Sequence, residues 1–495
     1  MGTSGCKAVV FDEKFNIVCD AYREYELSFP GEGLLELDPN VVWDNIKAVI
    51  SEANGKTDKP VNALAISAIG DVILPLRYDG TPVRKAIIDF DPRGTEQIKK
   101  FVSDFGEGAF FHITGMPPLF IGSLAKILWI QTNEPQIYDK VQRWGTFEDF
   151  IVQKLGRAPS VSYSEAARTM LFDIRDKAWS KQVLDKIPMD ERMLPKVVPS
   201  GTKLGKVQAG LAKKLGFSKS PEIVSGGHDM VCAAIGAGLD ERKSDTAVNI
   251  AGTIEGIVVA MDKANTGAAM LDNLFPCYPG YDGYVTFSVN LTAGCILRWY
   301  RDVIASDTYE LCKMSGEDVF EKLLEALEAD KPSEMIFLPH FSGSGNPHFD
   351  PNAKGTIYGL TLSSTRDDIV QAMIEGLCYE IKLHSDALRK AGIDISAIRS
   401  VGGGAKIDKQ LQLKANITGL IVIKGNVSES SALGAAAMAG VAMGQIKHPS
   451  EAFATAAKKE KRFVPQSETK KSFEKAYAKY AALFNKIHDF ESQNN

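Results

Sequence analysis

The sequence predicts an α/β protein built from two large lobes. The chain has 495 residues, which is more than one hydrophobic core usually organises, so two cores are expected. Strand-like apolar runs alternate with helical patterns along the chain. A Gly-Thr turn opens each half, at residues 2–3 and 252–253. We place the boundary in the polar stretch 240–245, which gives an N-terminal lobe of residues 1–243 and a C-terminal lobe of residues 244–495.

The composition is that of an ordinary globular protein, with 44% hydrophobic and 24% charged residues. The formal net charge of −5 gives no basic surface for nucleic acid or an anionic membrane, so we expect neither partner. The apolar run 432–444 is too short to span a bilayer. Seven dispersed cysteines and the absence of a signal-peptide pattern favour the cytoplasm.

The first half begins with a predicted hairpin. Residues 7–11 and 17–27 read as its two strands, and residues 12–16 as the turn between them. A further strand is predicted at 62–69, and helical patterns dominate from about 95 to 220. Near the end of this half, a short strand is expected to stop at Gly226-Gly227, with a helix over 228–239.

The second half repeats the alternation of strands and helices. Strands are predicted at 247–251, 398–401 and 420–424, each short and apolar. Helices are predicted from Asp408, over 430–443, and over 466–490, the last of which is charged and terminal. This order again favours an α/β lobe.

Glycine-rich turns after strands are candidate phosphate-binding sites, because glycine lets backbone amides approach an anion closely. Gly2-Thr3, Gly252-Thr253 and Gly402-Gly403-Gly404 are such turns, although a single Gly-Thr pair is usually only a turn. None of them fits the P-loop pattern GxxxxGK[ST], and none fits GxGxxG in a βαβ unit. A P-loop protein and a dinucleotide-dependent dehydrogenase are therefore disfavoured.

Two ordered patterns resemble the signatures of the FGGY carbohydrate kinase family. The segment 123–133 carries Ser123, Lys126 and Trp129 at the spacing of the first signature, and departs from it at Ile121. The segments 355–360 and 368–375 match the second signature throughout. Chance agreement over two such patterns is remote, so they are the strongest signal in the chain.

Further segments resemble the family in the same order along the chain, at 225–229, 251–255, 337–343, 402–406 and 429–434. The resemblance therefore covers essentially the whole chain. It implies two lobes of ribonuclease-H-like topology, related to actin and hexokinase, with ATP and a sugar in the central cleft.

Asp229 is the residue that the resemblance implies as catalytic base. An aspartate at a helix start is often only an N-cap. A kinase, however, needs a carboxylate to accept the proton of the attacking hydroxyl, and a helix N-terminus keeps that carboxylate ionised. His228 beside it is a candidate sugar contact, although a histidine at a helix start is as often structural.

The resemblance also implies substrate-binding residues in the N-terminal lobe. Asp91 and Arg93 match a Trp-x-Asp-x-Arg segment of the family, with Asp89 in place of the tryptophan. The alternative for this pair is a surface salt bridge. Asp71 follows Gly70 where family members contact sugar hydroxyls, and the alternative is an ordinary turn residue.

For the cofactors, the resemblance implies ATP with Mg²⁺. The phosphates are expected against the two Gly-Thr turns, with a lysine after the first of them: Gly2, Thr3, Lys7, Gly252 and Thr253. The adenosine is expected near Gly402, Gly403, Gly404, Ala405 and Lys406. The metal ligands are not identified. In the family, the first turn reads Asp-x-Gly-Thr, and Met1 stands here at the x position. Either the start codon has been assigned too late, which we expect because Gly2 onward matches, or the chain lacks this carboxylate.

The predicted function is ATP-dependent phosphorylation of a hydroxyl on a small sugar or polyol, with a ketose such as xylulose as the default substrate. One alternative is a non-catalytic family relative that senses a sugar or nucleotide. Another is a chaperone-like or actin-like ATPase, against which the two signatures argue. A homodimer is common among the proteins that the chain resembles.

Overall fold

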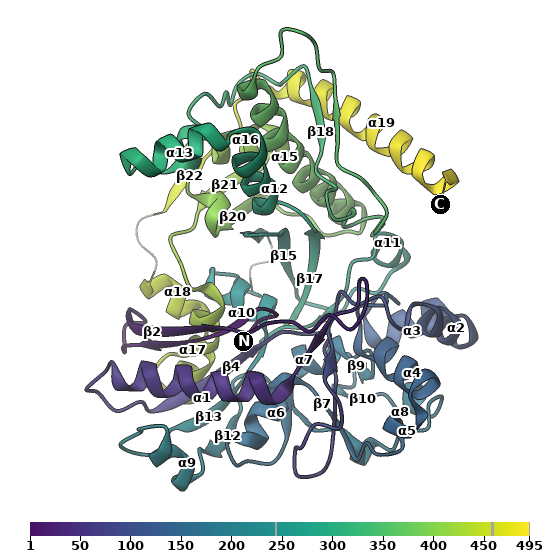
Figure 1. The fold of residues 1–495 in the computed structure, drawn as a ribbon, viewed down its shortest axis with the longest axis vertical. Helices are drawn as coiled ribbons and strands as arrows, with labels where there is room; N and C mark the ends of the chain where they lie inside the picture. Colours follow the sequence, from purple (N-terminus) through teal and green to yellow (C-terminus); the bar gives the residue numbers. More distant parts are fainter. Residues whose placement is uncertain (243–244, 457–459, 495) are drawn as a thin grey trace.

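The computed structural model describes residues 1–242, 245–456 and 460–494. Within these ranges the chain forms two α/β lobes, one above the other in Figure 1. The expected boundary between residues 243 and 244 lies outside the described residues. In the part of the chain that the structure describes, no helix combines the length and apolar character needed to cross a membrane.

The N-terminal lobe contains the predicted hairpin and a small sheet. Strand β1 (Gly5–Phe11) pairs antiparallel with β2 (Ile17–Glu24), which confirms the hairpin. Strand β4 (Ala63–Ala68) is parallel to β13 (Glu222–His228), and β12 (Lys203–Lys206) pairs with the other edge of β13. Helix α1 (Pro39–Gly55) packs on the hairpin through its buried face.

Strand β13 is longer than predicted, because it continues through both glycines to His228. A bulge between Ser225 and Gly227 keeps it paired with β4. A Cβ at Gly226 would lie 2.0 Å from the carbonyl oxygen of Ile66, so only glycine fits at this close approach. Helix α10 (Asp229–Gly236) therefore begins at Asp229, and His228 is the residue before it.

Short strands and helices complete the lobe: β3 (Glu36–Leu37), β5 (Leu74–Leu76), β6 (Ala86–Ile87), α2 (Thr95–Phe105), α3 (Glu107–Thr114), α4 (Ser123–Asn133), α5 (Pro135–Tyr138), β7 (Arg143–Gly145), α6 (Phe147–Lys154), β8 (Ser160–Ser162), α7 (Tyr163–Arg168), β9 (Phe172–Asp173), β10 (Ala178–Trp179), α8 (Lys181–Leu184), η1 (Glu191–Met193), β11 (Lys196–Val198) and α9 (Ala209–Lys214). The stretch expected to be mainly helical thus also contains several short strands.

The C-terminal lobe is organised around a seven-stranded sheet with the order β16-β17-β15-β14-β20-β21-β22. Its strands are β14 (Thr246–Ala251), β15 (Glu255–Met261), β16 (Tyr278–Pro279), β17 (Tyr284–Asn290), β20 (Ala397–Val401), β21 (Ile421–Lys424) and β22 (Lys461–Phe463). The three strands predicted from the sequence, β14, β20 and β21, lie side by side and are parallel.

The second half of the chain also contains α11 (Ala268–Asp272), α12 (Gly294–Trp299), η2 (Tyr300–Ile304), α13 (Ser306–Ser315), α14 (Val319–Leu323), β18 (Ile336–Leu338), β19 (Thr356–Tyr358), α15 (Arg366–Lys390), η3 (Gly403–Ala405), α16 (Asp408–Thr418) and α19 (Lys470–Asn494). Helix α18 (Ser450–Ala456) packs instead against α10 and α17. Helix α16 starts at Asp408 as predicted, and α19 is the expected terminal helix.

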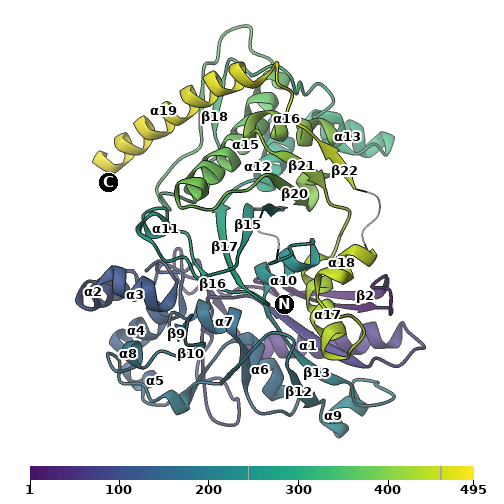
Figure 2. The same ribbon diagram turned by 180° about the vertical axis from the view of Figure 1, so that it is seen from behind.

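Helix α17 (Ser430–Ala442) belongs to the second half of the sequence but packs against the N-terminal lobe. It contacts α10, β4 and β13, and Figures 1 and 2 both show it beside α10 in the lower lobe. The two helices meet at glycines: a Cβ on Gly434 would lie 1.9 Å from the carbonyl oxygen of Cys232, and one on Gly236 would lie 1.9 Å from that of Ser430. The lower lobe is therefore completed by a distant part of the chain.

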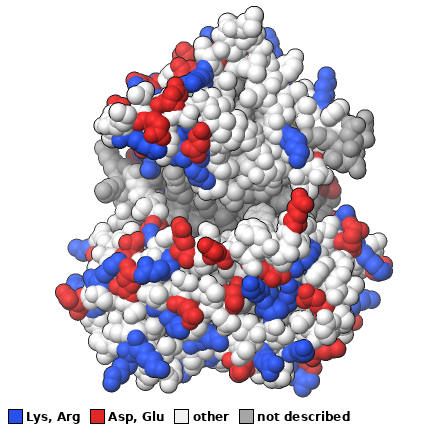
Figure 3. Space-filling view, in the orientation of Figure 1, with Lys and Arg blue, Asp and Glu red and all other residues white. Residues whose placement is uncertain are grey.

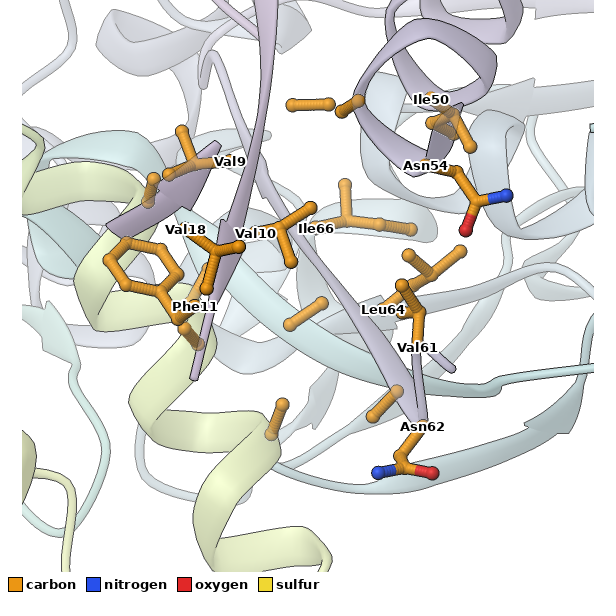
Figure 4. A pocket seen from close by; sticks show the side chains of 18 of the residues that line it. Val9, Val10, Phe11, Val18, Ile50, Asn54, Val61, Asn62, Leu64 and Ile66 are labelled. Carbon is orange, nitrogen blue, oxygen red and sulfur yellow. The ribbon is translucent and has the colours of Figure 1, made fainter. Parts of the chain in front are cut away.

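A cavity of about 1050 Å³ separates β1 from β4. These two strands are not hydrogen-bonded to each other, and each pairs within the described residues on one side, β1 with β2 and β4 with β13. Figure 4 shows Val10, Leu64 and Ile66 around the space. At one end, the amino group of Met1 donates to the Ser67 carbonyl oxygen at 2.9 Å, and the Ile69 amide donates to the Met1 carbonyl oxygen at 3.1 Å.

Candidate active site

Asp229 is the first residue of α10, which lies on the side of the lower lobe that faces the upper lobe (Figure 1). Figure 3 shows that the molecular surface is hollowed between the lobes. About a third of the Asp229 side chain (36%) remains exposed. Burial of the site raises the pKa of Asp229 to about 6, although the nearby amino group of Met1 acts in the opposite direction. At neutral pH this carboxyl group is ionised and can accept a proton.

His228 contacts the base directly. Its Nε2 lies 3.3 Å from Asp229 Oδ1, and its Nδ1 lies 3.0 Å from the Tyr278 hydroxyl oxygen. Burial holds the pKa of His228 well below its usual value, so the ring is neutral. Because a carboxylate only accepts, the single ring proton belongs on Nε2, and Tyr278 donates to Nδ1. The His228 ring is thus fixed by Tyr278 and lies against the Asp229 carboxylate.

Asp71 is held in a buried pair with Arg168. Arg168 Nε and Nη2 donate to Asp71 Oδ2 at 3.1 and 2.5 Å. The guanidinium also lies over the rings of Tyr278 and Phe287, at 5.4 and 5.1 Å from their centroids. Gly70, the residue before Asp71, packs against both His228 and Arg168. Asp71 therefore lies beside His228 and Asp229.

Replacing Arg168 with methionine should destabilise the protein by about 3–5 kcal/mol, because Asp71 would remain buried without its partner. Urea unfolding would measure the change. Arg192→Met is a matched control, since Arg192 pairs with Asp190 at the same 2.5 Å distance but is 89% exposed. Equal stability of the two variants would contradict a buried role for the Asp71–Arg168 pair.

Asp91 and Arg93 were also expected to contact the sugar, but their polar atoms are used within the protein. Asp91 is completely buried, and its oxygens accept from Arg93 and from the amide of Leu35. Arg93 Nη1 donates to Glu36 at 2.8 Å. We interpret Asp91 and Arg93 as a structural ion pair that holds the loop before α2. This agrees with the salt-bridge alternative, except that the pair is buried and not at the surface.

Two further carboxyl groups interact electrostatically with Asp229 and were not named as site residues from the sequence. Glu165 is 1% exposed, and neither of its carboxylate oxygens has a hydrogen-bond partner in the described residues. Asp89 is half-buried and its Oδ1 likewise has none. Burial, with a contribution from Asp71, raises the pKa of Asp89 to about 7. Asp89 lies in a segment that the sequence singled out, whereas Glu165 is marked by no motif.

Two of the turns predicted to bind the nucleotide lie together in the upper lobe. Gly252-Thr253 links β14 to β15, and Gly402–Ala405 follows β20, the parallel neighbour of β14. The two turns touch, because a Cβ on Gly402 would lie 2.5 Å from the Ala251 carbonyl oxygen, and Gly402 has φ +93°. Lys406 follows directly and is exposed.

The third predicted turn belongs to the lower lobe. The Gly2 amide donates to the Gly5 carbonyl oxygen at 2.9 Å, so Gly2 to Gly5, with Thr3 inside, form the tight turn before β1. Lys7 is paired with Asp20 and Glu429 at 2.9 and 2.7 Å. The structure therefore brings Gly2-Thr3 close to Asp229 through Met1, while Lys7 is engaged in ion pairs.

The upper turns fit a nucleotide phosphate. A Cβ on Gly403 would meet nothing within 4 Å, so the backbone there is open to a ligand. Within the described residues, no three His, Cys, Asp or Glu side chains gather as a metal site. Mg²⁺ bound with phosphates needs only one or two protein carboxylates and can keep several waters, so a site of three or more protein ligands is not required.

Comparison with known proteins decides the family. Models of the N-terminal and C-terminal domains of the FGGY family of carbohydrate kinases match residues 1–236 and 247–443. The chain belongs to the FGGY family. It is therefore a carbohydrate kinase, and this family uses ATP with Mg²⁺. The boundary between residues 243 and 244 falls between the two matches and remains a prediction.

Several FGGY relatives cover nearly the whole chain. Xylulose kinase of Staphylococcus epidermidis is 28% identical over 98% of this chain and 95% of its own length. Glycerol kinase of Oceanobacillus iheyensis is 30% identical over 91% and 90%. The structure of gluconate kinase from Lactobacillus acidophilus has a TM-score of 0.88 at 23% identity, covering 100% of this chain and 98% of that one. The expected two-lobe actin/hexokinase-type fold is thereby confirmed.

Proposed function

We propose that this FGGY kinase transfers the γ-phosphoryl group of ATP to a hydroxyl of a ketose such as xylulose, with Asp229 as general base. The observation that carries the proposal is the position of Asp229. Its carboxylate is partly exposed at the start of α10, 3.3 Å from His228 Nε2 and within electrostatic reach of the Met1 amino group. Helix α10 itself lies on the side of the lower lobe that faces the upper lobe (Figure 1). The xylulose kinases among the relatives make xylulose the first substrate to test.

The residues would divide the work as follows. Asp229 accepts the proton of the substrate hydroxyl as its oxygen forms the new bond to phosphorus. His228 holds the carboxylate in place through Nε2–H, and Tyr278 fixes the tautomer of the ring. The turns at Gly252-Thr253 and Gly402–Ala405 offer backbone amides to phosphate oxygens. Bound Mg²⁺ neutralises phosphate charge.

The test is a coupled assay of ADP release over ketoses, polyols and sugar acids. A kinase of this type releases ADP only when its substrate is present, and we expect the largest kcat/KM with a ketose. Release of ADP with no added sugar would indicate an ATPase. A best substrate outside the ketoses would overturn the assignment to xylulose but not the kinase activity.

The activity should also fall at low pH, because Asp229 becomes protonated and can no longer act as a base. Because the pKa of Asp229 is raised to about 6, the ionised form dominates above pH 6 and is lost below it. We therefore expect kcat/KM to fall about tenfold per pH unit below pH 6. The residual activity of Asp229→Asn should lack this acid limb. A flat profile between pH 5 and 7 in the native enzyme would contradict the assignment.

A further inference from the structure

The cavity between β1 and β4 is bordered on two sides by the edges of strands. Strand β1 pairs with β2 on its other side, and β4 pairs with β13 on its other side. Along a strand, successive residues turn their amide and carbonyl groups to opposite sides. The Ser4 carbonyl oxygen accepts from the Tyr25 amide, next to β2, so Lys7 and Val9 turn their backbone groups toward the cavity.

The same alternation applies to β4. The Asn62 carbonyl oxygen accepts from the Glu222 amide of β13, so Ala63, Ala65 and Ser67 turn their backbone groups toward the cavity. Within the described ranges, neither edge has a further strand beside it. The cavity therefore lies between two rows of backbone donors and acceptors, which a strand placed between them would pair.

Met1 forms the first rung of such a pairing. Its amino group donates to the Ser67 carbonyl oxygen at 2.9 Å, and its carbonyl oxygen accepts from the Ile69 amide at 3.1 Å. These are the two hydrogen bonds of a parallel pair between Met1 and Ala68. A charged amino group stands here in the position of a peptide N–H, and burial lowers its pKa. A peptide N–H would make the same bond without placing a charge in the interior.

The hydrogen bonds of Met1 also fix how many residues the cavity can hold. A strand that continues from Met1 in the N-terminal direction would run parallel to β4. Because Met1 lies beside Ala68, the five positions before it would face residues 63–67, and β4 begins at Ala63. The register along β4 therefore gives a length of five residues.

The hairpin on the other side gives the same length. The Gly2 amide donates to the Gly5 carbonyl oxygen, so these glycines lie opposite each other and Met1 lies opposite Cys6. The five positions before Met1 would then face residues 7–11, where β1 ends. Two independent registers thus agree on five residues, which span about 17 Å in extended conformation.

The other walls of the cavity are apolar. Helix α1 lines it with Ile46 and Val49, and α17 lines it with Ala435 and Ala439. Figure 4 shows Val10 among the apolar side chains that surround the space. A strand covered by helices on both faces is typically a continuous apolar run rich in β-branched residues.

We propose that the cavity between β1 and β4 is a strand site. It accepts a segment of five apolar residues in extended conformation, joined to Met1 by a peptide bond, parallel to β4 and antiparallel to β1. The two strands of the hairpin sheet and the three strands of the β4 sheet would then join, with the segment between them, in one six-stranded sheet. This inference is independent of the proposed kinase function.

Extended variants of the whole chain test the strand site. One carries a start methionine and Val-Ile-Val-Ile-Val joined to Met1. Its matched control carries Val-Pro-Val-Pro-Val, which is apolar but lacks two of the amide donors. We expect the first extension to raise Tm by at least about 4 °C over the 495-residue chain. The control should change Tm by less than about 1 °C.

Hydrogen exchange resolved to single amides locates the segment. In the Val-Ile variant, the amides of Lys7, Val9, Ala65 and Ser67 gain partners and should exchange at least about tenfold more slowly. The amide of Ala8 already faces β2 and serves as the internal reference. Protection of these four amides, together with the rise in Tm, would support the strand site.

Four results would overturn the proposal. The first is an equal Tm for the two extended variants, and the second is stabilisation without protection of the four amides. The third is failure of the Val-Ile variant to fold while the Val-Pro variant folds. The fourth is equal stabilisation of the 495-residue chain by free Val-Ile-Val-Ile-Val peptide in excess, which would assign the cavity to a separate partner strand.

Discussion

Replacing Asp229 with asparagine should lower kcat by about 10²–10⁴-fold, which is the usual contribution of a positioned general base. Asparagine keeps the size of the side chain and its contact with His228, but it cannot accept the hydroxyl proton. Turnover measured by ADP release, together with ATP affinity measured by titration, separates catalysis from binding.

The affinity for ATP should stay within about twofold, because the predicted nucleotide turns at 252–253 and 402–405 belong to the other lobe and the turn at Gly2-Thr3 is left unchanged. Asp240→Asn is a suitable control, since Asp240 lies shortly after the same helix and its partner Arg242 is exposed. Turnover by Asp229→Asn close to that of the native enzyme would exclude Asp229 as the base.

Replacing Gly434 with valine should destabilise the protein by at least about 3 kcal/mol, at the upper end of overpacking costs. The first added carbon would lie 1.9 Å from the Cys232 carbonyl oxygen, which is backbone and cannot rotate away. Helices α17 and α10 would have to separate. Any shift of α10 would displace Asp229, which is its first residue. Both stability in urea and kcat should therefore fall.

Ala439→Val is the matched control for this substitution. Ala439 lies on the same helix but lines the cavity between β1 and β4, where added methyl groups have room. It should be close to neutral in stability and in turnover. If Gly434→Val were as stable as Ala439→Val, the close contact between α10 and α17 would not matter to folding.

Local sequence patterns were enough to predict the hairpin β1–β2 and the three parallel strands of the upper sheet. Each is short, apolar and bounded by turn residues, so periodicity alone identifies it. The end of β13 was predicted wrongly, because glycine pairs usually stop a strand. Here they allow the strand to press against Ile66 and continue.

The sequence could predict only those site residues that belong to a recognisable local motif. The loop at Asp229 and the glycine turns are such motifs. The engagement of Asp91 and Arg93 with Glu36 and Leu35 was not predictable, because it depends on partners from other parts of the chain. The same holds for Glu165, whose proximity to Asp229 arises only when α7 packs against β13. Tertiary contacts of this kind leave no local pattern.

The position of α17 also sets the order in which the protein can be completed during synthesis. The lower lobe uses residues up to 236 and then residues 430–442. Ribosomes add roughly 5–20 residues per second, so nearly 200 intervening residues correspond to about 10–40 s. Throughout that interval the nascent lower lobe exposes the surface of α10, β4 and β13 that α17 later covers. The lower lobe can therefore be completed only when residues 430–442, close to the C-terminal end of the sequence, have been synthesised.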